Sequence, residues 1–340
     1  MKIKAVIFFI KNALIMCSVV YAGCVFSMDD ELTADHSEGI SAFDAGNYTE
    51  AEKYFLKQLK EPGAKNEALM YLSKIAWENG DGKVAVSYIE KALAIAPTNI
   101  DELLLSGNIY CGQAQKASLF SALKMAKKCI AQYEAAVKMD GENINALVAA
   151  IRFYVEAPSI AGGSTKKAKA FLERLHRLSP EEADIYSIQI LEVEGDSQSA
   201  LQLADELSKQ GFQSAISQYK VAHYYRDKKH YDKALTLFEA LSEMTATPDN
   251  QWQVNDSLLQ LGEIYILKGN DVNKGIELIE QYKEVNNDPQ DIHYFWSSWS
   301  LAKGYKAVGQ QEKYEALVKK IKAEDYKQDS AFAKDFEANI

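Results

Sequence analysis

The stretch AFDAGNYTEAEKYFLKQL (residues 42–59) recurs 34 residues later as AWENGDGKVAVSYIEKAL (residues 76–93). The matched positions hold a glycine, an alanine and a bulky apolar residue, namely Gly46/Gly80, Ala51/Ala85 and Phe55/Ile89. A further copy, YYRDKKHYDKALTLFEAL (residues 224–241), places Ala234 one such period beyond Ala200. Self-similarity at a fixed period of about 20 to 50 residues is typical of a repeat architecture.

Each repeat reads as a helix, a turn and a second helix. Small and aromatic residues three apart, as in Gly107/Tyr110 and Ala222/Tyr225, share one helical face, where the small residue admits a neighbouring helix. Glycines mark the turn inside the units, at Gly46, Gly80, Gly195, Gly269 and Gly309. Five prolines fall between units, and Pro158 falls in a turn within one. No segment shows sustained period-two alternation, so we predict no strands.

The predicted fold is all-α, a right-handed α-solenoid whose first helices line an inner groove. About eight units start near residues 36, 66, 100, 143, 181, 215, 253 and 293. The third unit has an extended second helix of roughly 20 residues, and the fourth has extra residues in its internal turn. We assign the array to residues 36–322 and a C-terminal capping segment to residues 323–340.

These motifs resemble tetratricopeptide repeat proteins over roughly residues 36–322. The long third unit and the turn after it also resemble exported bacterial repeat proteins of unassigned activity. That resemblance implies a scaffold in the cell envelope, and it carries over no catalytic residue.

The N-terminal segment is typical of an export signal. Lys2 and Lys4 precede an apolar stretch that Lys11 interrupts, so it reads as a signal peptide over residues 1–23 and not as a membrane span. Cleavage after Ala22 and cleavage before Cys24, which would then carry a lipid, remain alternatives. An acidic linker (residues 24–35) follows. We expect a protein in the periplasm or anchored in the envelope, touching the membrane only through a lipid on Cys24.

Composition excludes one class of partner. The chain is 47% hydrophobic and 25% charged, as in ordinary globular proteins, and its formal net charge is −10. Nucleic-acid binding needs a clustered basic face, so we expect no nucleic-acid partner.

The cysteines of the array pose a choice between thiols and a bridge. With a turn near residues 113–117, Cys111 should face a residue around 120, and Cys129 then lies more than about 10 Å further along the helix. Bridged α-carbons lie within about 7 Å of each other. The spacing therefore favours two buried thiols, with a disulfide as the alternative that an exported chain permits.

No catalytic or metal-binding pattern stands out. The five histidines are scattered, and none has metal-ligand spacing. Two serine–x–x–lysine matches, at residues 164–167 and 217–220, lack their companion motifs. We predict no catalytic residues, no metal and no cofactor, and hence no enzyme.

The stretch APSIAGGSTKKA (residues 157–168) invites two interpretations. A Walker loop would need a preceding strand and a lysine directly after the second glycine, and this stretch has neither. The favoured interpretation is a turn in which Ser164 caps the next helix. The alternative is an anion-binding turn at that helix start, formed by Gly162, Gly163, Ser164 and Lys166.

The groove positions of the first helices supply the candidate binding residues: Met70, Lys74, Trp77, Asn108, Tyr219, His223, Arg226, Leu259, Trp296 and Trp299. Aromatic and arginine side chains often anchor interfaces. Packing between repeats is the alternative for Trp77, Leu259 and Trp299, and a solvated surface is the alternative for Lys74, Asn108 and Arg226. We predict a non-catalytic scaffold that binds a protein or peptide. The alternative function is a small-solute or lipid carrier of an envelope transport system, binding near the third and fourth units.

Overall fold

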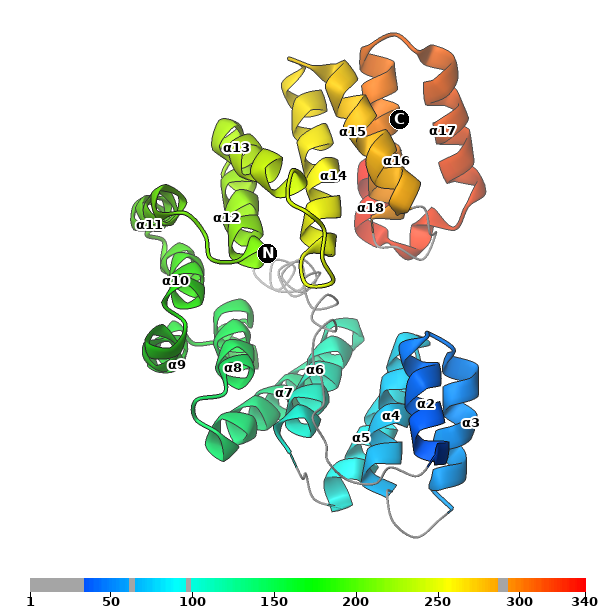
Figure 1. The fold of residues 1–340 in the computed structure, drawn as a ribbon, viewed down its shortest axis with the longest axis vertical. Helices are drawn as coiled ribbons and strands as arrows, with labels where there is room; N and C mark the ends of the chain where they lie inside the picture. Colours follow the sequence, from blue (N-terminus) through cyan, green and yellow to red (C-terminus); the bar gives the residue numbers. More distant parts are fainter. Residues whose placement is uncertain (1–33, 61–64, 96–98, 287–292) are drawn as a thin grey trace. The chain divides into compact units, whose positions relative to one another are not determined.

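The computed structural model describes residues 34–60, 65–95, 99–286 and 293–340. The expected signal segment, its cleavage positions and Cys24 lie outside these residues. Every regular element in the described ranges is a helix, seventeen α-helices in all, so the all-α prediction is confirmed (Figure 1). None of these helices combines the length and the apolarity that a membrane crossing requires.

The chain divides into two compact units between Leu203 and Ala204, within α11 (Ser197–Gln210). The helices of unit 1 follow one another as α2 (Ala34–Asp44), α3 (Tyr48–Gln58), α4 (Lys65–Glu78), α5 (Gly82–Ile95), α6 (Ile100–Lys116), α7 (Leu119–Met139), α8 (Ile144–Glu156), the short η2 (Ser159–Ala161), α9 (Thr165–Leu178) and α10 (Pro180–Glu194).

Unit 2 continues the same alternation of helix and turn. Its helices are α12 (Ala215–Asp227), α13 (Tyr231–Ser242), α14 (Gln251–Lys268), α15 (Val272–Val285), α16 (Tyr294–Ala307), α17 (Gln311–Ala323), the short η3 (Tyr326–Gln328) and α18 (Ser330–Asn339). In both units, the first helices begin within two residues of the starts that the repeat predicts.

The turn prediction is confirmed by the backbone. All five glycines that the repeat places in internal turns have positive φ, from 67° at Gly269 to 87° at Gly195. A residue in this left-handed region ends the first helix, and glycine adopts it without a Cβ clash. In the pair α12–α13, Lys229 occupies the equivalent position with a φ of 62°.

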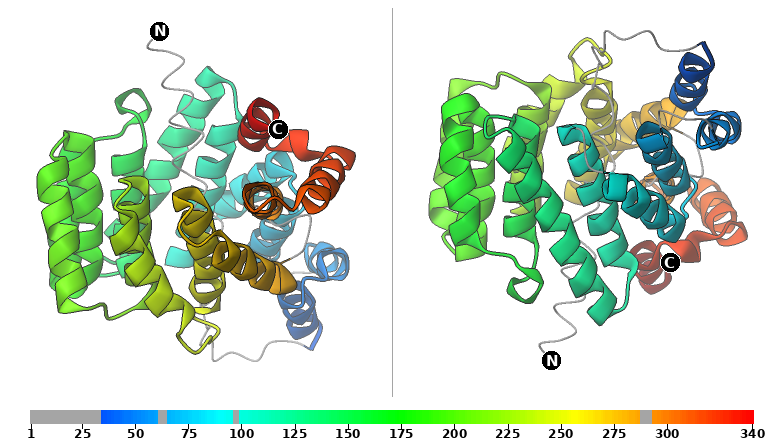
Figure 2. Two further views of the ribbon diagram at one scale, coloured as in Figure 1. Left: turned by 90° about the horizontal axis from the view of Figure 1, so that it is seen from above. Right: turned by 90° about the horizontal axis from the view of Figure 1, so that it is seen from below.

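Consecutive helices pack against each other in most of the described chain, as α4 does with α5, α6 with α7 and α14 with α15, and several successive first helices also touch. In unit 1, α6 contacts α8, and α8 contacts α10; in unit 2, α12 contacts α14, and α14 contacts α16. The repeated alanines and apolar residues, among them Ala51, Phe55, Ala85 and Ile89, are fully buried between these helices. Helix α18 follows the last pair and lies beside α16 (Figure 2).

Candidate functional site

The first helices of unit 2 bring three predicted groove residues together. We call the side on which α12, α14 and α16 adjoin one another the first-helix face. Tyr219, His223 and Arg226 project from α12 at spacings of four and three residues, so they share one side of that helix. Side chains of α14 and of the start of α16 complete the group.

Asp256 of α14 lies at its centre and is only 1% exposed. The Tyr219 hydroxyl donates to Asp256 Oδ2 at 2.5 Å, and Gln260 Nε2 donates to the same oxygen at 2.9 Å. Two histidines flank the carboxylate: His223 Nε2 lies 3.9 Å from Oδ2, and His293 Nε2 lies 3.8 Å from Oδ1. The carboxylate therefore joins residues of three consecutive repeats.

The protonation of this cluster follows from its surroundings. Burial on its own would raise the pKa of the Asp256 carboxyl, but His223, His293 and the Tyr219 hydroxyl outweigh it and hold that pKa below its usual value. Burial, reinforced by Asp256, raises the pKa of Tyr219 far above its usual value. Asp256 is thus an ionised acceptor, and Tyr219 is a neutral donor.

Arg226 extends the network toward α16. Its Nη2 donates to Glu263 Oε2 at 2.9 Å, and its Nη1 donates to Gln260 Oε1. The other oxygen of Glu263 accepts from Ser300 Oγ at 2.8 Å. The side chain of Arg226 is 32% exposed, so the guanidinium is held in place while part of it faces solvent.

The remaining groove candidates of unit 2 are structural. Leu259 is buried in the core. Trp299, also buried, donates from its indole Nε1 to Asp335 Oδ2 at 2.9 Å, and Trp296 donates to Asp329 Oδ2 at 3.1 Å. Asp329 and Asp335 belong to the N-cap and body of α18, which therefore covers both tryptophans.

The candidates of unit 1 do not form a comparable cluster. Met70 is buried. Lys74 Nζ lies 4.6 Å from the ring centroid of Tyr71, and Trp77 packs onto Gly112, where a Cβ would lie 2.1 Å from the indole. Asn108 accepts a hydrogen bond from Tyr133. Leu259 and Trp299 are buried, as the packing alternative states, and Met70 and Tyr219 are also buried and do not line an open groove.

Unit 1 instead contains an apolar pocket. It lies between α6, α7, α8 and the turn at η2, and its cavity volume is about 90 Å³. Its walls are mostly short or apolar side chains: Cys111, Ala114, Leu119, Ala122, Leu123, Ala126, Ala149, Phe153, Ala157, Pro158, Ile160 and Ala161. A mainly apolar lining with a few polar groups is typical of small-molecule sites.

The two departures from the standard repeat build this pocket. The first two turns of the 21-residue α7 supply Leu119, Ala122, Leu123 and Ala126. The inserted turn after α8 supplies Ala157, Pro158, Ile160 and Ala161. A repeat of ordinary length would lack both walls.

Five polar residues also line the pocket: Asn108, Gln115, Tyr133, Arg152 and Glu156. Arg152 Nε lies 3.5 Å from Glu156 Oε1, one turn further along α8. Burial raises the pKa of Glu156, and Arg152 opposes that shift without cancelling it. This pair brings opposite charges together in a largely apolar setting.

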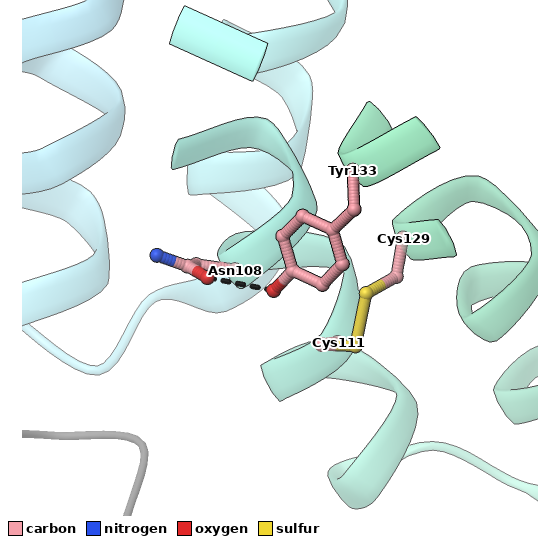
Figure 3. Close-up of a disulfide and its surroundings, with 4 residues drawn as sticks. All are labelled: Asn108, Cys111, Cys129 and Tyr133. Carbon is pink, nitrogen blue, oxygen red and sulfur yellow. Dashed lines mark hydrogen bonds between the residues drawn. A yellow bond between two sulfur atoms is a disulfide. The ribbon is translucent and has the colours of Figure 1, made fainter. Parts of the chain in front are cut away.

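Cys111, which lines the pocket, forms a disulfide with Cys129, so the expectation of two thiols was wrong. Cys111 and Cys129 are bridged, with their α-carbons 5.3 Å apart (Figure 3). The expectation was wrong because α6 runs on to Lys116 and α7 is shifted along it. The shift is possible because Gly107 has no side chain: a Cβ there would lie 2.2 Å from the Tyr133 ring.

The glycine-rich stretch forms a turn. Gly162 has a φ of 111°, and a Cβ on Gly163 would lie 1.7 Å from the carbonyl oxygen of Ala157. Ser164 N donates to Tyr154 O, and Ser164 Oγ caps α9 by accepting from Lys167 N. The Ser164 hydroxyl is therefore already engaged with the backbone, and Lys166 follows in the first turn of α9.

The described part of the chain holds no group of three or more His, Cys, Asp or Glu side chains arranged to bind a metal. Asp256 was not predicted from the sequence. The pocket lies between the third and fourth units, where the carrier alternative placed its binding site, but its lining residues were not predicted. An aspartate inside the helical pattern QWQVNDSLLQLG (residues 251–262) was the signal for Asp256. The signals for the pocket were the extended second helix of the third unit and the long turn of the fourth, and the alanines of α7 could have identified its walls.

Pairs of stacked helices with glycine turns define the class of α-helical repeat proteins. Residues 36–100 match the family model described as Tetratricopeptide repeat. No curated protein matches the chain in sequence. A tetratricopeptide repeat protein from Parabacteroides merdae ATCC 43184 has a similar structure, with a TM-score of 0.53, 14% identity and coverage of 79% of this chain and 96% of that one.

Yeast Tom70 is also similar in structure, with a TM-score of 0.66, 14% identity and coverage of 99% of this chain and 70% of that chain. At such low identity, these likenesses show the fold alone. Together with the match of residues 36–100, they confirm the predicted fold and support the resemblance to tetratricopeptide repeat proteins. Such proteins generally mediate protein–protein interactions and are generally not catalytic.

Proposed function

We propose that this protein is a non-catalytic scaffold of the cell envelope that binds a protein or peptide along the first-helix face of unit 2. The observation that carries the proposal is the network of Arg226, Glu263 and Ser300, which joins α12, α14 and α16 and leaves Arg226 partly exposed. Arginines held in a fixed geometry are frequent anchors of interfaces.

Preorganisation supports the same proposal. Gln260 and Glu263 fix the guanidinium of Arg226, so little side-chain entropy is lost when a partner contacts it. His223 and His293 are partly exposed on either side of the buried Asp256. A partner that presents carboxylates or carbonyl groups would match these donors.

Export to the envelope is supported by two independent features. One is the signal-like sequence of residues 1–23, and the other is the Cys111–Cys129 bridge, since disulfides persist mainly in oxidising compartments. The mass of the mature protein tests this part of the proposal. Cleavage before Cys24 together with the added mass of lipid indicates anchoring, and cleavage after Ala22 indicates a free periplasmic protein.

Crosslinking in intact cells, followed by capture on the purified protein, tests the scaffold. We expect Arg226→Ala to reduce capture of the crosslinked partner at least about tenfold, as for an interface anchor. Lys319→Ala, a change of an exposed cation on α17, is the matched control and should leave capture unchanged. Equal capture by both variants would place the interface away from Arg226.

A second function, that of a small-solute or lipid carrier, is favoured by the pocket of unit 1, because a simple spacer would not need it. Native mass spectrometry of gently purified protein tests this function. A bound small molecule supports it, and protein free of ligand that shows no thermal shift with apolar metabolites argues against it.

A further inference from the structure

We propose that the pocket between α6, α7, α8 and η2 takes an uncharged, mainly apolar small molecule that carries one hydrogen-bond-accepting group. Alcohols, ketones, esters and amides with an alkyl chain belong to this class. The inference rests on the proposed carrier function and names the chemistry of its cargo.

The walls select an apolar body. Alanines on three helices, among them Ala114, Ala122, Ala126 and Ala149, are too short to fill the space that the helices enclose. Leu123 and Phe153 supply larger apolar surfaces around it. Because burial of each methylene is worth roughly 0.8 kcal/mol, which is about fourfold in affinity, an alkyl chain gains affinity with length until the pocket is full.

The exposed residues at the edge of the pocket also favour an apolar ligand. Leu119 and Ile160, which line the pocket, remain 38% and 60% exposed, and their neighbour Phe120 is 86% exposed. Helix α7 and the η2 turn, which carry them, contact each other. An apolar ligand that enters between these segments would cover part of this exposed surface.

Charge balance argues against an ionic ligand. The only charged residues that line the pocket are Arg152 and Glu156, and they already pair with each other. A carboxylate or ammonium group brought into this space would have no counter-charge of its own, and burying an unpaired charge is costly. A neutral ligand avoids that cost.

Asn108 lines the pocket and is the candidate donor for the ligand's polar group. Its Oδ1 accepts from the Tyr133 hydroxyl at 2.6 Å, which fixes the orientation of the amide (Figure 3). Its amide nitrogen has no hydrogen-bond partner among the described residues. The disulfide lies next to this pair and links the same two helices, so Asn108 belongs to a helix that is covalently joined to its neighbour.

Titration calorimetry of the full chain at pH 7 with n-octanol, octanoate and octylammonium tests the inference, since these probes differ only in head group. We expect octanol to bind at least about tenfold more tightly than either ion. From hexanol to octanol, affinity should rise about fourfold per methylene.

Two variants locate the site. Ala149→Leu extends a half-buried wall residue into the pocket and should abolish octanol binding, whereas Ala131→Leu, on an exposed position of α7, should not change it. Glu156→Gln removes one negative charge beside Arg152, so the affinity for octanoate should rise at least about tenfold relative to that for octanol. Circular dichroism verifies that each variant is folded.

The possible results distinguish a failure of the neutral-ligand inference from a failure of the carrier function. Octanoate or octylammonium binding as tightly as octanol, with loss in Ala149→Leu, would refute the neutral-ligand inference and leave the carrier function standing. No binding of any probe to the folded wild type would refute both. Binding that Ala149→Leu leaves intact would refute the assignment to this pocket.

Discussion

Trp299 and Asp335 are joined by a 2.9 Å hydrogen bond from the indole Nε1 to the carboxylate, although 36 residues separate them. The tryptophan lies on α16 and is 1% exposed, and the aspartate lies on α18. The last repeat therefore does not end in an exposed apolar face. In a repeat array, this apolar face is otherwise covered by a neighbouring repeat, and α18 covers it here.

Loss of this cover should destabilise unit 2. Phe336 of α18 is fully buried and lies 5.1 Å from Trp299, measured between ring centroids. We expect Phe336→Ala to lower the free energy of unfolding by about 3 to 5 kcal/mol in urea denaturation, because it leaves a cavity. Lys334→Ala, on the exposed side of α18, should change it by less than about 0.5 kcal/mol. Similar effects of the two changes would contradict the role of α18.

The Cys111–Cys129 bridge should stabilise unit 1. It closes a loop between residues 18 apart, which corresponds to about 3 kcal/mol through the lost entropy of the unfolded chain. We expect the double variant Cys111→Ser, Cys129→Ser to lose about this amount in urea denaturation under non-reducing conditions. The wild type with reductant is the control and should match the variant. Free thiols at both positions in unfolded, non-reduced wild type would disprove the bridge.

Asp256 should make the stability of unit 2 depend on acid pH. Its pKa is lower in the folded chain than in the unfolded chain, where it is about 3.9, so its contribution is fully present above that value and is lost as the pH falls through the folded pKa. We expect Asp256→Asn to be less stable than wild type by about 1 to 3 kcal/mol at pH 7. The difference should shrink below about pH 4.

Urea denaturation over this pH range measures that difference. Asp249→Asn, at an exposed position just before α14, is the matched control and should follow the wild type throughout. A difference between Asp256→Asn and wild type that grows as the pH falls would have the wrong sign for an ionised, hydrogen-bonded carboxylate.

Lys229 offers a change in the stabilising direction. It has a φ of 62° where the equivalent turns have glycine, and side chains disfavour this region by about 1 kcal/mol. We expect Lys229→Gly to raise the free energy of unfolding by up to about 1 kcal/mol, measured by thermal and urea unfolding. Lys228→Gly is the control: Lys228 has a φ of −82°, so glycine there should bring no gain. If Lys229→Gly lowered the free energy of unfolding, the positive φ of Lys229 would not be a source of backbone strain.

The repeat and its turns were predictable because they depend on local chemistry. A glycine at the end of a first helix relieves a Cβ clash within the same turn, and this requirement is visible in the sequence at Gly46 or Gly269. The starts of the first helices followed from the same period.

The site depended on contacts that no local pattern encodes. The pairing of Cys111 with Cys129 required the end of α6 at Lys116 and the fit of Tyr133 against Gly107. Likewise, Tyr219 meets Asp256 across 37 residues, and only the packing of α12 against α14 brings them together. Spacing within one helix could place Tyr219, His223 and Arg226 on one side, but it could not supply their partners.

The Cys111–Cys129 disulfide also limits the length to which a pulling force can extend the protein. When the chain is pulled from its two ends, the segment between Cys111 and Cys129 bears no load, because the sulfurs carry the tension past it. Its 18-residue span corresponds to roughly 60 Å of extended chain, which would appear in a single-molecule trace only after reduction.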